Sequence, residues 1–122
     1  IDGFVATNTT LHRPVPRNAA SRSVFAESGG LSGGPLQARS NEVIRLLYEE
    51  TQSSVPIVGV GGIDSVDTAW QAVSSGASLL QLYSALVFNG PSVVSGIVKG
   101  LKKRVKENGF LGIEEAVGLD IT

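Results

Sequence analysis

The stretch Val55-Pro56-Ile57-Val58-Gly59-Val60-Gly61-Gly62-Ile63 decides the fold of this chain. It is an almost wholly apolar run that ends in two glycines, which is typical of a strand buried on both faces of a parallel sheet. Two other apolar runs also end in polar residues: Gly3-Phe4-Val5-Ala6 leads into Thr7-Asn8-Thr9-Thr10, and Ser78-Leu79-Leu80-Gln81-Leu82 leads into Tyr83-Ser84. Parallel α/β enzymes build one site from several loops of this kind.

Helical patterns separate the three apolar runs. Apolar residues at helical spacing predict a helix after Ser40, which is placed as its N-cap. Asp64-Ser65 supplies the cap of a second helix, and Gly76 is suited to end it in a left-handed conformation. The apolar stripe of this second helix consists of Val66, Ala69, Trp70 and Val73. Pro91 opens a last long helix. Successive βα units predict right-handed parallel crossovers, but periodicity leaves open whether the strands belong to an open sheet or to part of a barrel.

A long segment, residues 8–39, joins the first strand to the first helix and is rich in Gly, Ser, Pro and Asn. A connection of this length is more often a functional loop than a linker, and it stays open whether it contains a short hairpin. Near its end, residues 31–36 (LSGGPL) would let the backbone approach a flat ligand, with Ser32 available for a hydrogen bond. The alternative is a mobile surface turn. His12, in the same segment, is expected to be exposed.

Composition narrows the class of protein. A hydrophobic share of 42% and a charged share of 17% suit a globular chain. A formal net charge of −1 does not indicate a nucleic-acid-binding protein. The absence of cysteine excludes disulfides and thiolate sites, and one histidine excludes a histidine metal cluster within this chain. No apolar run reaches the length of a membrane span, so we expect this chain alone to be soluble. Because it starts at Ile1 and contains no methionine, we expect a piece of a longer protein.

Two strand ends together predict a phosphate site. Gly61-Gly62 would expose backbone N–H groups at close range, and the helix that follows adds its positive end. Tyr83-Ser84 ends the next strand, and the last two strands of (β/α)₈ barrels often carry the phosphate-binding loops. A tight turn without a ligand is the competing interpretation of the two glycines. The basic residues of the last helix are expected to form a solvated face: Lys99, Lys102, Lys103, Arg104 and Lys106.

The polar run after the first strand predicts a site for a small planar ligand. Asn8 offers an amide with donors and an acceptor, beside threonine hydroxyls that do either. Such a cluster suits carbonyls, N–H groups or a carboxylate. An Asx or ST turn is the alternative, and four polar residues in succession make it less attractive.

Taken together, these motifs resemble the C-terminal part of the dihydroorotate dehydrogenases, specifically the class 2, membrane-associated and quinone-linked type. The specific elements are Thr7-Asn8-Thr9-Thr10, Gly29-Gly30-Leu31-Ser32-Gly33 with Pro35-Leu36, and Gln81-Leu82-Tyr83-Ser84. The elements Val58-Gly59-Val60-Gly61-Gly62 and Gly76-Ala77-Ser78 also match, but many phosphate-binding barrels share them. The resemblance covers essentially the whole chain.

The resemblance implies a TIM (β/α)₈ barrel, of which residues 1–122 would be the C-terminal portion, about three βα units of an incomplete domain. It implies FMN as the cofactor, with contacts from Thr7, Ser32, Gly33, Gly61, Gly62, Tyr83 and Ser84. Asn8 and Thr9 would hold the orotate ring beside the flavin. Relatives often have Thr where Ser84 stands, and the hydroxyl is kept. The ending Gly118-Leu119-Asp120-Ile121-Thr122 departs from a common basic ending in the family.

The implied reaction is the oxidation of dihydroorotate to orotate in pyrimidine biosynthesis. A base removes a proton from one ring carbon while hydride passes from its neighbour to flavin N5. The resemblance places that base, a serine, in the preceding half of the barrel, together with a lysine and further asparagines. Quinone would be the electron acceptor, and the full-length enzyme would be a peripheral protein of the inner membrane. We therefore expect the isolated chain to be inactive, and to associate either with the missing half or with itself.

Two other interpretations stay open. The chain could be a half-barrel that binds a phosphate ligand or serves a structural role without catalysis. It could also belong to another flavin or phosphate barrel, such as a tRNA dihydrouridine synthase. The run Thr7-Asn8-Thr9-Thr10 and the near-neutral charge weigh against the latter. FMN binding with an orotate-dependent spectral change would favour the dehydrogenase, whereas phosphate binding indifferent to orotate would favour the module.

Overall fold

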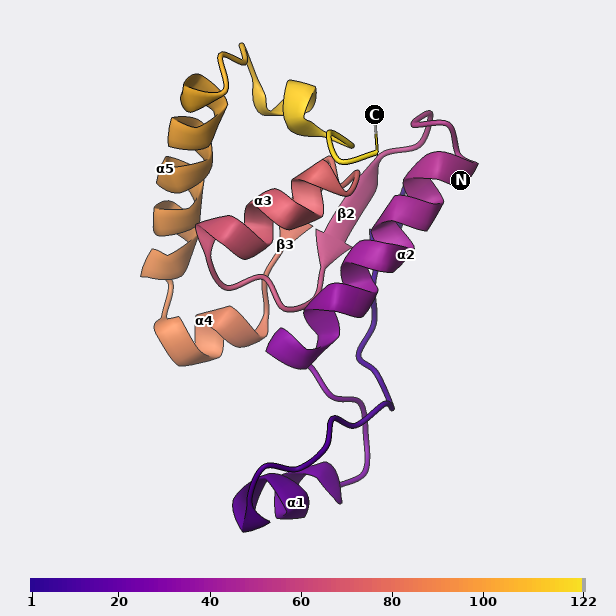
Figure 1. Cartoon of the computed structure of the whole chain (residues 1–122), viewed down its shortest axis with the longest axis vertical. Coiled ribbons are helices and arrows are strands. Elements are labelled where there is room, and N and C mark those ends of the chain that lie inside the picture. Colours follow the sequence, from indigo (N-terminus) through magenta and orange to yellow (C-terminus); the bar gives the residue numbers. More distant parts are fainter. Residues whose placement is uncertain (122) are drawn as a thin grey trace.

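The computed structural model describes residues 1–121 and contains a three-stranded parallel sheet (Figure 1). The strands β1 (Phe4–Ala6), β2 (Ile57–Val60) and β3 (Leu79–Gln81) lie side by side in sequence order. Val58 pairs with Val5 on one side and with Leu79 on the other. The three predicted parallel strands are therefore confirmed, although each is shorter than its apolar run.

Three longer helices follow the strands or precede them. Helix α2 (Gln37–Glu50) precedes β2, α3 (Val66–Ser74) joins β2 to β3, and α5 (Ser92–Glu107) comes after β3. In Figure 1, α3 lies between α2 and α5. The remaining elements are short: α1 (Ala19–Phe25), η1 (Gly34–Leu36), α4 (Ser84–Asn89) and η2 (Ile113–Ala116). Of these short elements, η2 lies near the end of the chain, and α1 and α4 were not predicted from the sequence.

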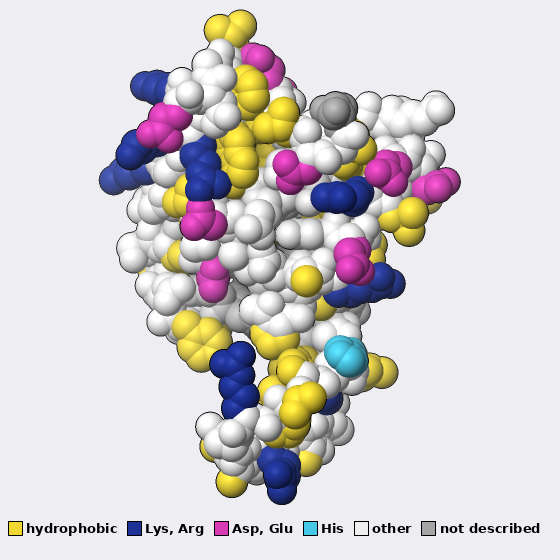
Figure 2. All heavy atoms as spheres, in the orientation of Figure 1, with side chains coloured by type: hydrophobic (Ala, Val, Ile, Leu, Met, Phe, Trp, Pro, Cys, Tyr) yellow, Lys and Arg dark blue, Asp and Glu magenta, His cyan; other side chains and the backbone are white. Residues whose placement is uncertain are grey.

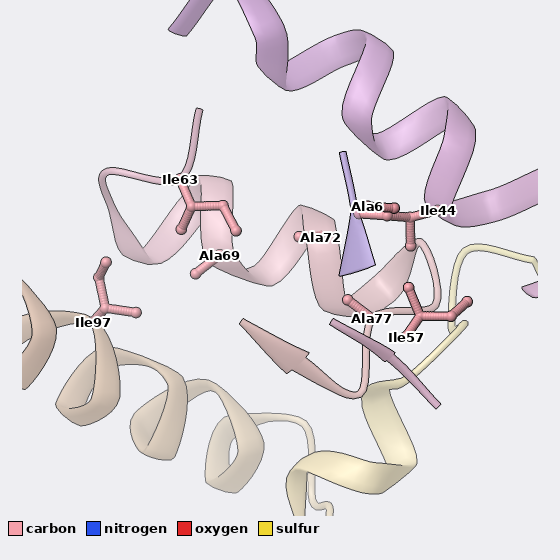
Figure 3. Close-up of a cluster of buried hydrophobic side chains, with 8 residues drawn as sticks. All are labelled: Ala6, Ile44, Ile57, Ile63, Ala69, Ala72, Ala77 and Ile97. Atoms are coloured by element: carbon pink, nitrogen blue, oxygen red, sulfur yellow. The ribbon is translucent and has the colours of Figure 1, made fainter. Parts of the chain in front are cut away.

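The hydrophobic core lies between the sheet and the helices. Its buried side chains are Ala6, Ile44, Ile57, Ile63, Ala69, Ala72, Ala77 and Ile97 (Figure 3). Gly59 in β2 lets the layers close, since a Cβ there would lie 2.9 Å from Ala77 Cβ and 3.1 Å from Ile44 Cδ1. A missing side chain at the centre of the sheet thus sets the spacing between β2 and α2.

The opposite face of the sheet is open. Because side chains alternate along a strand, Val5, Val58 and Leu79 share the face that points away from the core. Val5 is 67% exposed and Leu79 is 63% exposed. Within the described residues, no further strand pairs with β1 or β3. The outer edges of β1 and β3 and one face of the sheet are therefore uncovered in the described part of the chain.

Ser40 does not cap α2, so that prediction was wrong. The helix begins at Gln37, directly after the 3₁₀ turn η1, whose proline sets the backbone for an earlier start. Ser40 instead lies in the first turns of α2, where it is 1% exposed and its hydroxyl donates to the Val60 carbonyl at 2.7 Å. The Ser40 hydroxyl therefore pairs with the carbonyl at the end of β2 rather than with an N–H at the start of α2.

The other predicted helix boundaries agree with the structure. Ser65 is the N-cap of α3 and forms a capping box with Thr68. Gly76 follows α3 with a φ of 117°, in the left-handed region. In the predicted stripe, Ala69 and Val73 are buried, whereas Val66 and Trp70 are half-buried. Ala72 and Ser74 are buried as well, so the buried face is rotated and wider than predicted.

Residues 11–30 form a projection that we call the arm. Its base is closed by an antiparallel bridge between Thr10 and Leu31, with N–H···O distances of 3.0 and 2.7 Å. Helix α1 lies at its far end, and the arm extends from one end of the body as a separate lobe (Figures 1 and 2). The question of a hairpin is thereby answered: the segment is a hairpin-like arm with a helix at its tip. His12 is exposed, as predicted.

The basic residues of α5 face solvent. Lys99, Lys102, Lys103 and Lys106 are exposed, and dark blue side chains gather along the α5 side of the molecule in Figure 2. Arg104 differs, because it is half-buried, pairs with Asp67 and lies over the Trp70 ring at 5.6 Å from its centroid. The predicted solvated face is confirmed for the lysines, while Arg104 joins α5 to α3.

Candidate functional site

A cavity of about 560 Å³ lies at the carboxyl ends of the three strands. This volume is in the range of roughly 300–1,000 Å³ that is usual for small-molecule sites. Its walls come from the loop after β1, the end of the arm, the loop after β2 and the loop after β3. All the candidate residues from the sequence line it: Thr7, Asn8, Thr9, Ser32, Gly33, Gly61, Gly62, Tyr83 and Ser84.

The turn Gly61-Gly62 requires glycine because α2 approaches it closely. Gly61 and Gly62 have φ of 131° and 69°. A Cβ on Gly62 would lie 2.6 Å from the Cβ of Gln37 and 3.0 Å from its backbone nitrogen. Packing is therefore sufficient to explain the two glycines, which agrees with the tight-turn interpretation. Within residues 1–121, however, neither glycine N–H donates to a backbone carbonyl, so both are available to a ligand.

The end of the arm and the loop after β3 meet through two serines. The hydroxyl oxygens of Ser32 and Ser84 are 2.9 Å apart and share a hydrogen bond. Beside them, Gly33 has a φ of 81°, and a Cβ there would lie 3.9 Å from Ser84 Cβ. Tyr83 also lines the cavity, and it is 78% exposed. Residues far apart in the sequence thus form one wall.

Thr7 carries a polar atom without a protein partner. Its N–H donates to the Val60 carbonyl at 2.8 Å, which ties the end of β1 to the end of β2. Its hydroxyl Oγ1 is buried and, among the described residues, has no hydrogen-bond partner. Buried hydroxyls are normally paired, so this atom is suited to a ligand group in the cavity that Thr7 lines.

Asn8 is only partly occupied by local hydrogen bonds. Its Oδ1 accepts from the Thr9 N–H at 2.8 Å and, more weakly, from the Thr9 hydroxyl at 3.4 Å. This bond joins adjacent residues and is not an Asx turn, whereas Thr10 forms the alternative ST turn, because its Oγ1 accepts from the His12 N–H at 3.1 Å. The Nδ2 amide donates to none of the described residues, and Asn8 is exposed at the cavity. Thr9 packs against the arm, because a Cβ on Gly30 would lie 1.8 Å from Thr9 Oγ1.

Sequence reasoning missed several cavity residues. Asp64, Gln81, Phe88 and Asn89 also line the space. Phe88 and Asn89 belong to α4, a helix too short to leave a periodic signal. Gln81 was detectable, because alternation along β3 places it on the uncovered face beside Leu79. Among the described lining residues, the titratable side chains are those of Asp64 and Tyr83.

No metal site is found in the described part of the chain, where no three His, Cys, Asp or Glu side chains gather. None of the described helices combines the length and apolarity needed to cross a bilayer.

Comparison with known proteins assigns the family. The family model described as "Dihydroorotate dehydrogenase" matches residues 1–105. The chain belongs to the dihydroorotate dehydrogenase family. The resemblance seen in the sequence motifs is therefore confirmed.

Curated relatives within the dihydroorotate dehydrogenase family match nearly the whole chain. "Dihydroorotate dehydrogenase (quinone)" from Nostoc punctiforme is 46% identical over 123 residues, which cover 98% of this chain and 33% of the relative. The mitochondrial protein of the same name from Mus musculus is 48% identical over 120 residues, covering 98% of this chain and 30% of the relative. The chain thus spans about a third of the length of these relatives.

Solved dihydroorotate dehydrogenase structures match the fold. A ligand-free enzyme from Eimeria tenella has a TM-score of 0.88 and 33% identity, covering 98% of this chain and 32% of that one. A complex of the Eimeria tenella enzyme with ferulenol has a TM-score of 0.87, also at 33% identity. The fold of these enzymes is a TIM barrel, so the three βα units here are part of a (β/α)₈ barrel rather than of an open sheet. Their C-terminal position within the barrel stays a prediction.

Proposed function

We propose that this chain supplies the FMN phosphate site and part of the orotate site of a quinone-linked dihydroorotate dehydrogenase. That enzyme oxidises dihydroorotate to orotate in pyrimidine biosynthesis. One observation carries the proposal: nine residues chosen from four separate segments of the sequence line a single cavity at the carboxyl ends of the strands. Family membership supports the same reaction. Residues 1–122 would then form the C-terminal portion of the barrel.

The cavity fits FMN in three respects. The free N–H groups of Gly61-Gly62 and the backbone of Tyr83-Ser84 offer donors for the phosphate. The unpartnered Thr7 hydroxyl offers a hydrogen bond to the cofactor. Gly33, beside Ser32, leaves room for a flat ring system. FMN, when bound, supplies the two-electron acceptor for the oxidation. The residues of this chain bind it and orient it.

Asn8 and Thr9 would hold the pyrimidine ring. The Asn8 Nδ2 amide has two donor hydrogens and no partner among the described residues, which suits a carbonyl or carboxylate oxygen. The Thr9 hydroxyl adds an acceptor that the weak 3.4 Å contact with Asn8 leaves available. Because the same loop leads back to Thr7, the substrate would lie beside the cofactor.

The proton-accepting base would come from another part of the barrel. In the described cavity wall the titratable groups are Asp64 and Tyr83, and the resemblance assigns the base to a serine in the preceding half. We therefore propose that the 122-residue chain alone does not turn over dihydroorotate. The rest of the barrel would cover the uncovered sheet face, and it would belong either to the same polypeptide or to a second one. Alternatively, another copy of this chain would cover that face. Turnover by the purified chain with no second polypeptide would contradict this.

Replacement of Asn8 tests the substrate site. In the polypeptide that contains these residues, Asn8→Ala removes the free amide, and we expect orotate to bind roughly tenfold more weakly with FMN content unchanged. The measurement is the orotate-dependent change of the flavin spectrum. Asn108→Ala is the matched control, because Asn108 lies at the end of α5 and donates to the Arg104 carbonyl. Equal orotate affinity in the two variants would contradict the proposed role.

The names of the relatives contain "quinone", which supports a quinone as the electron acceptor, and the resemblance to the quinone-linked class supports a location at the membrane. We propose that a quinone reoxidises the flavin and that the full-length enzyme is peripheral to the inner membrane. Quinone-dependent turnover with vesicles containing the quinone tests both points. Turnover with a water-soluble acceptor, but not with the quinone-containing vesicles, would contradict them.

A half-barrel that binds a phosphate ligand or only assembles is the second candidate. The uncovered sheet face and the steric explanation for Gly61-Gly62 favour it. Phosphate binding that ignores orotate, without retained flavin, would select this alternative.

A further inference from the structure

We propose that Arg13 is a positioning residue that holds the two ends of the arm together, so that Thr9 and Ser32 face the same ligand. The identity of that ligand rests on the proposed function. The set of hydrogen bonds from Arg13 across the arm, which we call the clamp, does not depend on it. Arg13 is not among the residues that line the cavity. Its role would therefore be indirect.

The guanidinium of Arg13 donates to backbone carbonyls on both sides of the arm. On the outgoing side, Nη1 donates to the Thr10 carbonyl at 2.9 Å. On the returning side, Nη2 donates to the Gly29 carbonyl at 2.5 Å, and Nε donates to the Phe25 carbonyl at 3.3 Å. A longer contact of 3.5 Å joins Nη2 to the Glu27 carbonyl. One planar group thus bridges the two sides.

Arginine is the side chain suited to this arrangement. Its guanidinium presents five donors in a fixed fork, so several carbonyls are bound at once. Among the described residues Arg13 has no carboxylate within ion-pair distance, so its donors are directed at the backbone. Hydrogen bonds from a charged donor are stronger than those between neutral groups. A lysine in the same place would offer a single point of charge.

The clamp leads directly to the cavity. Thr10 and Leu31 form the bridge at the base of the arm, and their neighbours Thr9 and Ser32 are cavity residues. On the returning side, Gly30 packs against Thr9, where no side chain would fit. Ser32 then shares its hydrogen bond with Ser84 after β3. The clamp, the bridge and the two serines form one continuous set of contacts.

The arm contributes little to the core, so its ordering is a local matter. Helix α1 has no buried residue, and no residue of the arm belongs to the core cluster. Val15 and Leu11 are 87% and 81% exposed. Loss of the Arg13 contacts should therefore free the arm without unfolding the sheet and helices. This separates a positioning role from a role in global stability.

The test compares Arg13→Ala, Arg13→Lys and the control Arg17→Ala in the holoenzyme that contains this chain. Arg17 is exposed on the same arm and forms none of these contacts. For Arg13→Ala we expect a KM for dihydroorotate raised roughly tenfold, with kcat within about twofold and the unfolding midpoint unchanged. Arg13→Lys should restore only part of the KM, and Arg17→Ala should match the parent protein.

Hydrogen exchange supplies a readout that does not depend on the ligand. The N–H groups of Thr10 and Leu31, both paired in the bridge, should exchange roughly tenfold faster in Arg13→Ala. Unchanged exchange would overturn the clamp, and faster exchange with an unchanged KM would overturn its coupling to the cavity. If the parent protein bound no orotate, the proposed function would fail, while the exchange rates would still decide the clamp.

Discussion

Thr7 and Gly62 show how single residues serve the cavity in different ways. Thr7 keeps a buried hydroxyl without a partner among the described residues, and Gly62 keeps the space into which a side chain would otherwise intrude. The first is costly for the protein alone and useful to a ligand, whereas the second is required by packing in any case. Substitutions at the two positions should therefore have opposite effects on stability.

Thr7→Val should separate ligand binding from stability. The substitution keeps the shape and removes a buried hydroxyl that has no protein partner, so we expect the ligand-free protein to be as stable as the parent or more stable. The dissociation constant for FMN should rise roughly tenfold, because the proposed hydrogen bond from Thr7 to the cofactor would be lost. Flavin titration and denaturant unfolding measure the two effects. A destabilised variant with normal FMN affinity would refute this role for Thr7.

Gly62→Ala should destabilise the protein and weaken flavin retention. The new Cβ would meet Gln37 at 2.6 Å, and the φ of 69° disfavours alanine, so we expect a loss of about 2–4 kcal/mol of unfolding free energy. Gly109→Ala is the matched control, since Gly109 has a φ of 73° with nothing within 4 Å of the added Cβ. The difference in denaturant midpoint isolates the contact with α2. Equal losses in both variants would mean that only backbone strain matters.

At the residue scale, the sequence was informative about which residues meet but not about their hydrogen bonds. The candidate residues that follow β1, β2 and β3 could be predicted because parallel strands bring their carboxyl ends to one edge, whereas Ser32 and Gly33 lie at the end of the arm and were assigned from the family resemblance. The Ser32–Ser84 contact joins a loop to the first residue of α4, and Arg13 lies in the arm, and no periodic pattern marks such pairs. Ser40 was assigned a role from its residue type, whereas its hydroxyl binds the end of a strand.

Among the elements, α3 and α5 pack more closely than ordinary side chains would allow. A Cβ on Gly100 would lie 2.2 Å from Val66 Cγ2, so the absence of a side chain permits the contact. Farther along α5, Arg104 pairs with Asp67 and lies over Trp70. Both helices were predictable from capping and apolar spacing. The arm and α4 were not, because α1 buries no stripe and α4 has only 6 residues.

Gly100→Ala should weaken the packing of α5 on α3. Alanine favours the helix by about 0.5–1 kcal/mol, but the contact with Val66 should cost more, and we expect a net loss of about 1–2 kcal/mol. Gly96→Ala is the control on the same helix, where nothing lies within 4 Å of the added Cβ, and it should stabilise the protein. Urea unfolding compares the two. A stabilised Gly100→Ala variant would show that the helices adjust freely.

At the scale of the whole molecule, the chain has a core on one face of its sheet and an open surface on the other. The helices cover Ile57 and Ala6, whereas Val5 and Leu79 are largely exposed. The family fold explains this arrangement, because inward-facing side chains of a barrel pack against strands that the described residues do not include. Sequence periodicity predicted the strands but could not show which face lacked a partner.

Leu79→Gln should therefore act differently in two settings. In the 122-residue chain the side chain is 63% exposed, so we expect less than about 0.5 kcal/mol of change. In a polypeptide with the rest of the barrel, the same substitution should cost about 2 kcal/mol or more, because a buried apolar group is replaced by an amide. Denaturant unfolding of both proteins checks this. Equal costs would mean that the sheet face stays open in the assembled protein.

Native mass spectrometry of the purified protein tests the central claim most directly. We predict an assembly that contains the remaining barrel strands, in the same or a second polypeptide, together with a single FMN per barrel. Added orotate should increase the mass of that assembly, and Asn8→Ala should lose this increase while keeping FMN. A bare chain of 12.7 kDa, or a homo-oligomer of it, with neither flavin nor bound orotate would contradict the proposed site.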